Sequence, residues 1–380
     1  MYKRTLQASI EKRIGSGKAI IVTGPRQVGK TTLMTTILRG TPFLFLNGDD
    51  PSTREMLGGA DTGRIRSILG TYNRVFIDEA QRIPDIGQTM KIITDQFKQV
   101  QLFASGSSSF DLANQLNEPL TGRKWEYQLF PVSWEEFEQQ HGYLASQQQL
   151  EHRLIYGFYP DVLMSPGDEI PVLRNLVNSY LYRDLLIYGG IKKTDALDKL
   201  VRALAFQTGS EVSYAELGQM TGLDTKTVSR YIEILEKGYV VFRLGAFSRN
   251  LRNEIRKNNK IYFYDNGVRN MIIGNFDPPA SRTDKGALWE NFLVSERIKQ
   301  IAYKESLART YFWRTKQQQE VDWVEDLGGR ISGFEFKWDA QGRERLSASF
   351  INTYKAESKT IDRTNFRDFV TMDRVTPGTA

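Results

Sequence analysis

The chain contains no cysteine and only two histidines, His141 and His152, among its 380 residues. Without cysteine it can form no disulfide, no thiolate zinc site and no cysteine nucleophile. Two histidines exclude a histidine-rich metal site and argue against hydrolysis by a serine triad. No run approaches the ~18 apolar residues of a membrane-spanning helix, and the polar N-terminus lacks the apolar core of a signal peptide. We therefore expect a cytoplasmic protein with no membrane partner.

Positive charge is in modest surplus, with 51 Lys and Arg residues against 45 Asp and Glu residues and a net charge of +6. This surplus is explained by a solvated surface alone, and it also suits an anionic partner. Hydrophobic residues make up 40% of the chain, which is enough to build real cores. At about 150 residues a domain, we expect two or three domains.

Short apolar runs alternate with helical patterns in the first third of the chain. The runs at 19–23, 43–46, 75–77 and 101–104 are typical of buried strands, and helices are expected at 31–38 and 86–97. This alternation predicts an α/β fold with a parallel sheet. From residue 131 to about 200 the pattern is mostly helical, and residues 286–380 again mix helix and strand.

Residues 24–31 fit the phosphate-loop pattern G-x-x-x-x-G-K-[ST] at every fixed position, between an expected strand and an expected helix. The glycines let backbone N–H groups surround phosphate oxygens, while Lys30 would reach the β and γ phosphates and Thr31 would bind Mg²⁺. A chance glycine-rich turn is the alternative. The candidate nucleotide-binding residues are Gly24, Pro25, Arg26, Gln27, Val28, Gly29, Lys30, Thr31, Thr32 and, further along, Ser107.

Two adjacent acids, Asp78 and Glu79, follow the expected strand at 75–77. Asp78 would hold Mg²⁺ and Glu79 would orient the attacking water, an arrangement that favours hydrolysis; a pair of acids capping the next helix is the alternative. Ser107, in the Ser/Gly stretch after the strand at 101–104, either senses the γ-phosphate or belongs to a simple turn. Arg123 either serves a neighbouring subunit's nucleotide or is an ordinary surface arginine.

A helix-turn-helix is expected at 212–237, with its turn at 221–223. In the second helix the apolar positions share one face. The opposite face could contact DNA, or the unit could serve only for packing or protein contacts. The candidate DNA-binding residues are Lys226, Thr227, Ser229 and Arg230. A basic cluster at Arg249, Arg252, Arg256, Lys257 and Lys260 would add sequence-tolerant binding.

Three carboxylates and a lysine in the last third have the spacing E…D…E-x-K of PD-(D/E)xK nucleases. Glu335 and Lys337 share one face of an expected strand, and Asp322 lies on another. Glu290, Asp322 and Glu335 would hold Mg²⁺, and Lys337 would position water or stabilise charge. Two alternatives remain open, because such spacing also arises by chance and a nuclease fold can lose its activity.

These motifs together resemble the bacterial and archaeal AAA-type ATPases that carry a DUF4143 C-terminal region, over residues 2 to about 340. Further resemblance lies at 130–137, 182–185, 264–267 and 320–322. The resemblance implies an AAA+-like ATPase domain at 1–130, a helical lid-like region at 131–200, a winged helix-turn-helix at 201–257 and a nuclease-like domain at 258–380. It also implies a homo-oligomer, such as a ring, with Arg123 as the arginine finger. The sensor position departs from the usual Asn or Thr, because this chain offers Ser.

The sequence thus predicts a protein that hydrolyses ATP with Mg²⁺ and acts on DNA, with a C-terminal domain that either cuts the DNA in a Mg²⁺-dependent reaction or grips it. One alternative is a DNA motor or remodeller with an inactive nuclease-like domain. An alternative of another class is a regulatory switch in which ATP controls assembly and partner binding.

Overall fold

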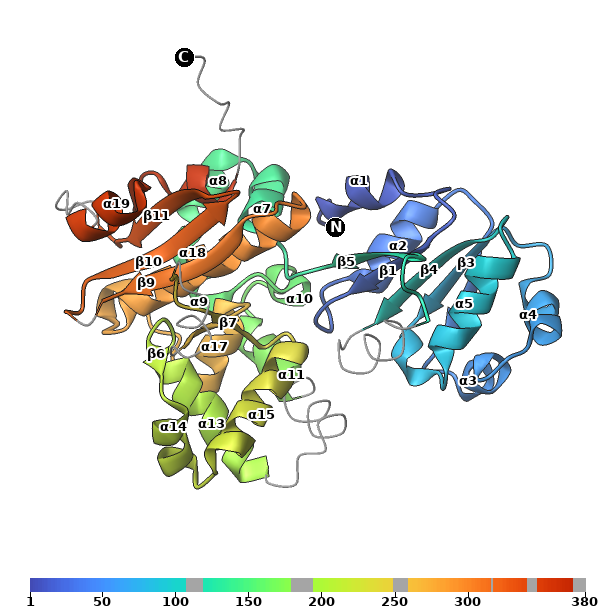
Figure 1. Cartoon of the computed structure of the whole chain (residues 1–380), viewed down its shortest axis with the longest axis horizontal. Helices are drawn as coiled ribbons and strands as arrows, with labels where there is room; N and C mark the ends of the chain where they lie inside the picture. Colours follow the sequence, from blue (N-terminus) through green and yellow to red (C-terminus); the bar gives the residue numbers. More distant parts are fainter. Residues whose placement is uncertain (107–118, 179–193, 249–258, 316, 340–346, 372–380) are drawn as a thin grey trace, which may run out of the picture. The chain divides into compact units, whose positions relative to one another are not determined.

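The computed structural model describes residues 1–106, 119–178, 194–248, 259–315, 317–339 and 347–371 (Figure 1). The chain divides into two compact units, Met1–Val132 with Lys237–Tyr239, and Ser133–Glu236 with Val240–Ala380. The first unit ends at Val132, where the sequence analysis placed a boundary at residue 130. Within the described residues, no helix has the length and apolar character needed to cross a bilayer.

The first unit is built on a five-stranded sheet in the order β2-β3-β4-β1-β5, in which every pairing is parallel. This confirms the predicted parallel α/β fold. The strands are β1 (Ala19–Thr23), β2 (Leu44–Asn47), β3 (Arg74–Asp78), β4 (Gln101–Gly106) and β5 (Lys124–Gln128). The helices are α1 (Leu6–Glu11), α2 (Lys30–Leu38), α3 (Pro51–Leu57), α4 (Thr62–Leu69) and α5 (Ile86–Gln96), with a 3-10 helix, η1, at Ala80–Arg82.

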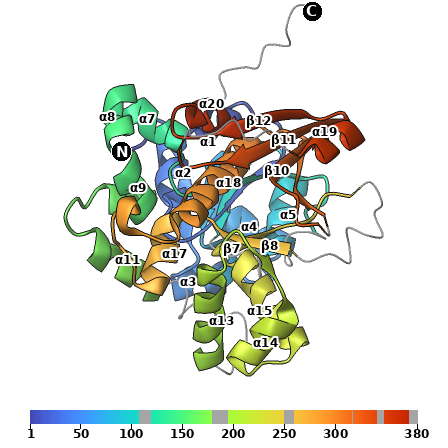
Figure 2. The same cartoon turned by 90° about the vertical axis from the view of Figure 1, so that its left-hand side faces the viewer.

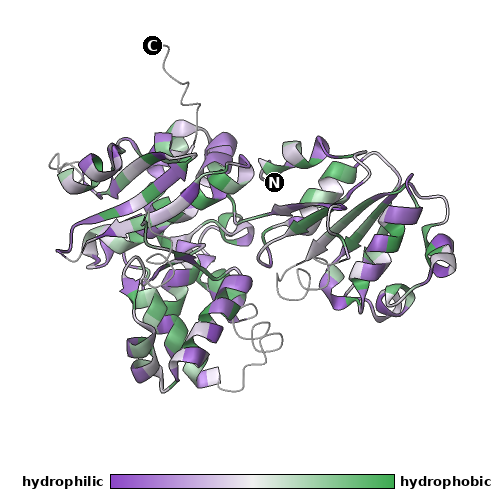
Figure 3. Ribbon diagram, in the orientation of Figure 1, coloured by the Kyte–Doolittle hydropathy of each residue, from purple (hydrophilic) through white to green (hydrophobic). Residues whose placement is uncertain are grey.

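Strand β1 lies between β4 and β5 and is buried along its whole length, because both of its faces are covered. Ala19 and Ile21 belong to a core cluster with Leu57, Ile65 and Met90, which come from α3, α4 and α5. In Figure 3 the strands of this sheet are largely hydrophobic. Since β4 lies between β1 and β3, the carboxyl ends of these three strands meet at one edge of the sheet.

The second unit begins with helices, as the sequence predicts. They are α7 (Trp134–His141), α8 (Tyr143–Gln148), α9 (Leu150–Tyr156), α10 (Pro160–Leu163), α11 (Glu169–Val177) and α13 (Thr194–Phe206). A capping box at Ser133 and Glu136 starts α7. Trp134 is fully buried and stacks edge-on against Phe158, Phe292 and Phe366, so that segments far apart in sequence share one aromatic core.

The helix-turn-helix consists of α14 (Tyr214–Thr221) and α15 (Thr225–Lys237), joined by a turn in which Gly222 has a φ of 72°. It is accompanied by an antiparallel sheet of β6 (Glu211–Val212), β8 (Asn259–Phe263) and β7 (Val241–Leu244), in that order. Because β8 is the central strand, this sheet takes strands from both sides of the boundary predicted at 257/258.

A four-stranded mixed sheet in the order β12-β11-β10-β9 forms the C-terminal part. Its strands are β9 (Arg309–Arg314), β10 (Glu320–Leu327), β11 (Arg330–Phe336) and β12 (Glu357–Ile361). The helices are α17 (Asn266–Ile273), α18 (Lys285–Tyr303), α19 (Ala348–Tyr354) and α20 (Phe366–Val370), with the 3-10 helix η3 at Pro279–Ser281. Figure 2 shows the long helix α18 against this sheet, and α18 contacts both β11 and β8.

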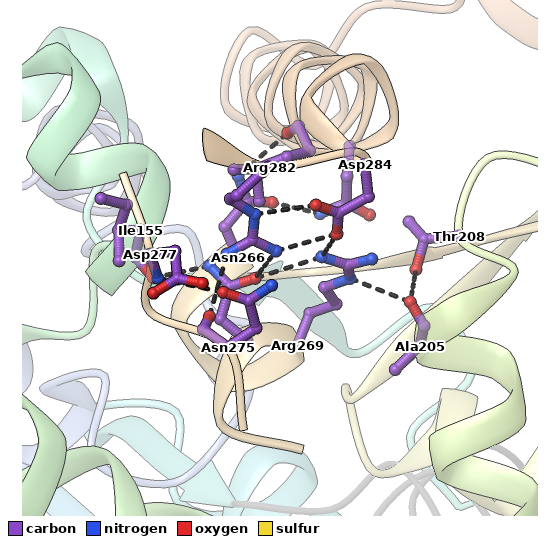
Figure 4. Close-up of polar contacts among 12 residues, drawn as sticks. Ile155, Ala205, Thr208, Asn266, Arg269, Asn275, Asp277, Arg282 and Asp284 are labelled. Atoms are coloured by element: carbon purple, nitrogen blue, oxygen red, sulfur yellow. Dashed lines mark hydrogen bonds and ion pairs between the residues drawn. The ribbon is translucent and has the colours of Figure 1, made fainter. Parts of the chain in front are cut away.

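Buried arginines connect α17 to the start of α18 (Figure 4). Arg269 forms an ion pair with Asp284 and donates through Nε to the Ala205 carbonyl at 2.9 Å. Arg282 donates to the same carboxylate at 2.8 Å. Burial alone would raise the pKa of Asp284, but hydrogen bonds from Arg282 and the charge of Arg269 lower it to about 2. The carboxylate is therefore ionised at neutral pH and joins α13, α17 and α18.

Candidate functional site

The phosphate loop runs from the end of β1 to the start of α2 and depends on its glycines. Gly24 has a φ of 148°, and a Cβ there would lie 2.1 Å from the carbonyl oxygen of Leu129. Gly29 has a φ of 91°, in the region that favours glycine, and Gln27 also has a positive φ of 59°. Only glycine fits at Gly24, so the tight wrapping predicted for this loop is present.

Lys30 lies inside the loop and is 6% exposed. Its Nζ donates to the carbonyl oxygens of Gly24 at 3.0 Å and Pro25 at 2.7 Å. Burial lowers the pKa of Lys30 to about 8, although the carboxylates of Glu79 and Asp78 oppose the shift. The loop therefore encloses the Lys30 ammonium group, which contacts carbonyl oxygens of the loop. A positive charge in this position suits an anionic ligand.

Asp78 ends β3 beside the phosphate loop and is 7% exposed. One carboxylate oxygen accepts a hydrogen bond from the Thr31 hydroxyl at 2.7 Å. The other oxygen accepts a hydrogen bond from the Ser105 hydroxyl. Ser105 is on β4, which lies between β1 and β3 in the sheet. The two residues predicted to hold Mg²⁺ therefore meet, and a carboxylate with a hydroxyl is an oxygen donor set that fits this ion.

Glu79 follows Asp78 with a φ of 47°, a left-handed conformation that is rare for glutamate and frequent at functional sites. Its Oε2 accepts a hydrogen bond of 2.6 Å from the Gln81 amide. Gly48 passes close by, since a Cβ there would lie 2.4 Å from the Glu79 carbonyl oxygen. The side chain predicted to orient water is therefore held by Gln81 and by an unusual backbone.

The remaining loop positions contribute in different ways. Val28 is fully buried, so it can serve a ligand only through its backbone. Arg26 lies near enough to Lys30 for its charge to lower the pKa of the lysine. Gln27 is exposed, and so is Thr32 in the first turn of α2.

Three residues of the site escaped the sequence analysis. Ser105 binds Asp78, whereas the predicted sensor Ser107 lies outside the described residues. Gln81 holds Glu79, and its position two residues after the acid was the only local signal. Arg4 donates to the carbonyl oxygens of Val28 at 2.7 Å and Phe130 at 2.6 Å, and so braces the loop from the N-terminal segment.

Arg123 lies far from the phosphate loop of its own unit. Its carbonyl oxygen accepts a hydrogen bond from Ala19 at the start of β1, which places it at the amino-terminal edge of the sheet. Its Nε lies 2.7 Å from Oδ1 of Asp95. A role toward the nucleotide of a neighbouring subunit stays a prediction.

The four candidate DNA contacts all lie at the start of α15. Asp224 caps this helix by accepting hydrogen bonds from the backbone of Lys226 and Thr227 at 3.0 Å each. The Thr227 hydroxyl also donates to Asp224 at 2.6 Å, so it is engaged in the cap. Lys226 and Arg230 are exposed, and Ser229 is half-buried.

The carboxylates of the C-terminal domain have partners within the protein. Glu290 accepts a hydrogen bond of 2.6 Å from the Tyr262 hydroxyl and lies 3.1 Å from Nζ of Lys260. Asp322 accepts one of 2.8 Å from the Phe336 backbone, and burial and the charge of Glu290 raise its pKa to about 7. Lys260 has only 2% of its side chain exposed, so it does not belong to a basic surface cluster.

The predicted metal site of Glu290, Asp322 and Glu335 is not assembled. Among the described residues, no three Asp, Glu, His or Cys side chains are placed to hold a metal ion. Glu335 and Lys337 do share a face and lie 2.8 Å apart, but this pairing turns Glu335 to its own lysine. Since Lys260 pairs with Glu290, the donor set does not fit a divalent cation.

Two other predicted features lie wholly or mostly outside the described residues. They are the 182–185 motif and, from the basic cluster, Arg249, Arg252, Arg256 and Lys257.

We predict that nucleotide binding takes up a proton at Lys30 above pH 8. Burial gives the free lysine a pKa of about 8, and phosphate oxyanions would raise it. As pH rises through 8, the affinity for ADP should fall by up to about tenfold per unit, because the neutral amine must first be protonated. Calorimetry at pH 7, 8 and 9, in two buffers of different ionisation enthalpy, measures both effects. Lys30→Arg should remove the dependence, and equal wild-type affinities at pH 7 and 9 would contradict it.

Three family profiles match successive parts of the chain. One described as an AAA domain matches residues 16–138. Two domains of unknown function, DUF8612 and DUF4143, match residues 147–278 and 285–376. The DUF8612 match continues past residue 257 and includes β8, in agreement with the central place of that strand in its sheet.

The similarity to other proteins covers most of the chain. An uncharacterized protein of Mycobacterium tuberculosis is 28% identical over 339 residues, which cover 88% of this chain and 74% of that protein. An uncharacterized protein of Haemophilus influenzae is 26% identical over 315 residues, covering 77% and 74%. A Walker-type ATPase of Pyrococcus abyssi has a similar fold, with a TM-score of 0.50, 15% identity and coverage of 72% of this chain and 96% of that one. The chain therefore contains an AAA-type ATPase domain followed by a DUF4143 domain.

Proposed function

We propose that the protein hydrolyses ATP with Mg²⁺ and uses this reaction to act on DNA. The observation that carries the proposal is the meeting of Lys30, Thr31 and Asp78 at the carboxyl edge of the sheet. The Thr31 hydroxyl lies 2.7 Å from Asp78, and the Lys30 ammonium is enclosed in the adjoining loop. These groups supply the two requirements of a nucleotide site, a cation for the phosphate groups and oxygen ligands for Mg²⁺.

Each residue of the site has a distinct role in this proposal. Backbone N–H groups of residues 24–29 and the Lys30 ammonium bind phosphate oxygens. Thr31 and Asp78 are the residues that would hold Mg²⁺, which when bound neutralises phosphate charge. Glu79 orients the attacking water and accepts its proton. Gln81 donates to Oε2 of Glu79 and so fixes the carboxylate.

The place of Arg123 supports an oligomer, such as a ring. Since it lies at the sheet edge opposite the phosphate loop, a role in hydrolysis would be toward a nucleotide held by a neighbouring copy and not toward that of its own chain. Delivering the guanidinium would require its ion pair with Asp95 to open. In that arrangement hydrolysis depends on assembly.

The exposed Lys226 and Arg230 on α15 support DNA as the partner, and the net charge of +6 agrees with a polyanion. Cutting at Glu290, Asp322 and Glu335 is not part of the proposal, because these acids are not placed to hold a cation. A motor or remodeller of DNA is therefore favoured over a nuclease.

We predict that Glu79→Gln lowers the kcat for ATP by about 10²- to 10⁴-fold while ATP binding is retained, because the amide cannot accept the proton from water. Phosphate release and nucleotide binding should be measured on the same preparation. Glu55→Gln makes the same change at an exposed position on α3 of the same unit and should leave both values unaltered. Normal turnover by Glu79→Gln would refute the assignment.

Replacing Lys226 and Arg230 together by alanine should weaken duplex DNA binding and reduce the slope of log affinity against log salt by about 2. Fluorescence anisotropy at three salt concentrations measures this. Lys199→Ala with Arg202→Ala removes the same charge from the exposed face of α13 and is the control. An equal loss of DNA affinity in the two double variants would refute a DNA-binding surface on α15. An ATPase rate that is the same with and without DNA would favour the regulatory switch.

A further inference from the structure

Lys260 is a buried lysine at the centre of the acidic cluster in the second unit. It lies on β8, and its side chain is 2% exposed. Its Nζ lies 3.1 Å from Oε1 of Glu290 on α18 and 2.5 Å from Oε1 of Glu320 at the start of β10. One ammonium group therefore bridges a helix and a strand that come from distant parts of the sequence.

Neighbouring groups complete the cluster. Tyr262, two residues after Lys260 and on the same face of β8, donates to the same oxygen of Glu290 at 2.6 Å. Asp322, two residues after Glu320, accepts a hydrogen bond from the Phe336 backbone at 2.8 Å. Arg314 lies 3.7 Å from Glu320 and 3.3 Å from Glu211. The carboxylates are thus bound by cationic and neutral donors of the chain itself.

This arrangement competes directly with a divalent cation. Mg²⁺ binds carboxylate oxygens at about 2.0–2.1 Å and usually keeps several waters. Lys260 and Tyr262 both occupy Oε1 of Glu290, and a metal ion at this carboxylate would meet the ammonium charge at short range. Gly209 also covers this carboxylate, because a Cβ there would lie 3.2 Å from its Cδ, which leaves little room for water.

We propose that Lys260 is the built-in cation of this cluster and that it excludes a divalent metal ion from the acids of the C-terminal domain. The lysine fixes β8 to α18 and β10. The domain then serves as a scaffold or binding module, and no phosphodiester cutting is expected from it. The inference does not depend on the proposed ATPase activity.

The test is Mn²⁺ binding by the full chain without nucleotide, measured by electron paramagnetic resonance of the free ion. Wild type and Asp322→Asn should bind equal amounts, because any ion at the phosphate loop is common to both. Lys260→Met should gain one bound Mn²⁺ per chain, and its Tm should rise by roughly 5–10 °C at 100 times the dissociation constant. Adding Asp322→Asn should abolish both gains.

Lys285→Met is the control, because Lys285 pairs with Asp339 at 3.6 Å on a partly exposed surface and should gain no ion. A wild-type Mn²⁺ ion that Asp322→Asn loses would overturn the proposal. So would a folded Lys260→Met variant that binds no more Mn²⁺ than wild type. If Lys260→Met fails to fold without Mn²⁺, the comparison of wild type with Asp322→Asn decides.

Discussion

Asp78 carries a buried negative charge at the end of β3, and the candidate ATPase site is arranged around it. A carboxylate in this position is costly unless hydrogen bonds or a cation compensate it. Thr31 brings one hydroxyl from the start of α2, and Ser105 brings another from β4. Both can reach Asp78 only because β4 lies between β1 and β3 in a parallel sheet. The strand order therefore determines the chemistry at this edge.

The features that could be predicted from sequence are those whose signal is local. The apolar run of β1 and the following loop are contiguous, so both could be predicted. Asp78 was predicted from the end of its own strand, and the parallel fold brings it to Thr31, 47 residues away. Arg4 gave no such signal, because its partners Val28 and Phe130 are 24 and 126 residues away. Ser105 could not be told from its serine neighbours, since only the strand geometry shows which hydroxyl faces Asp78.

The C-terminal acids show what a spacing motif cannot predict, namely the partners that tertiary packing brings to its residues. A period of two correctly places Glu335 and Lys337 on one face. It says nothing about Lys260. This lysine contacts Glu290, which is 30 residues away, and it also contacts Glu320 on β10, a strand of a different sheet from its own strand β8. The sequence motif identifies the acidic residues, but which cationic group lies against them depends on tertiary packing. Strand pairing between distant segments likewise puts β8 between β6 and β7.

The most direct measurement is calorimetric titration of wild type and Asp78→Asn with ADP, each in Mg²⁺ and in EDTA. If Asp78 and Thr31 form a cation site beside the phosphate loop, wild type binds one ADP more tightly in Mg²⁺ than in EDTA. Asp78→Asn should lose this difference and keep the affinity seen in EDTA. Wild type that gives no saturable heat, or binds equally with and without Mg²⁺, would contradict the account.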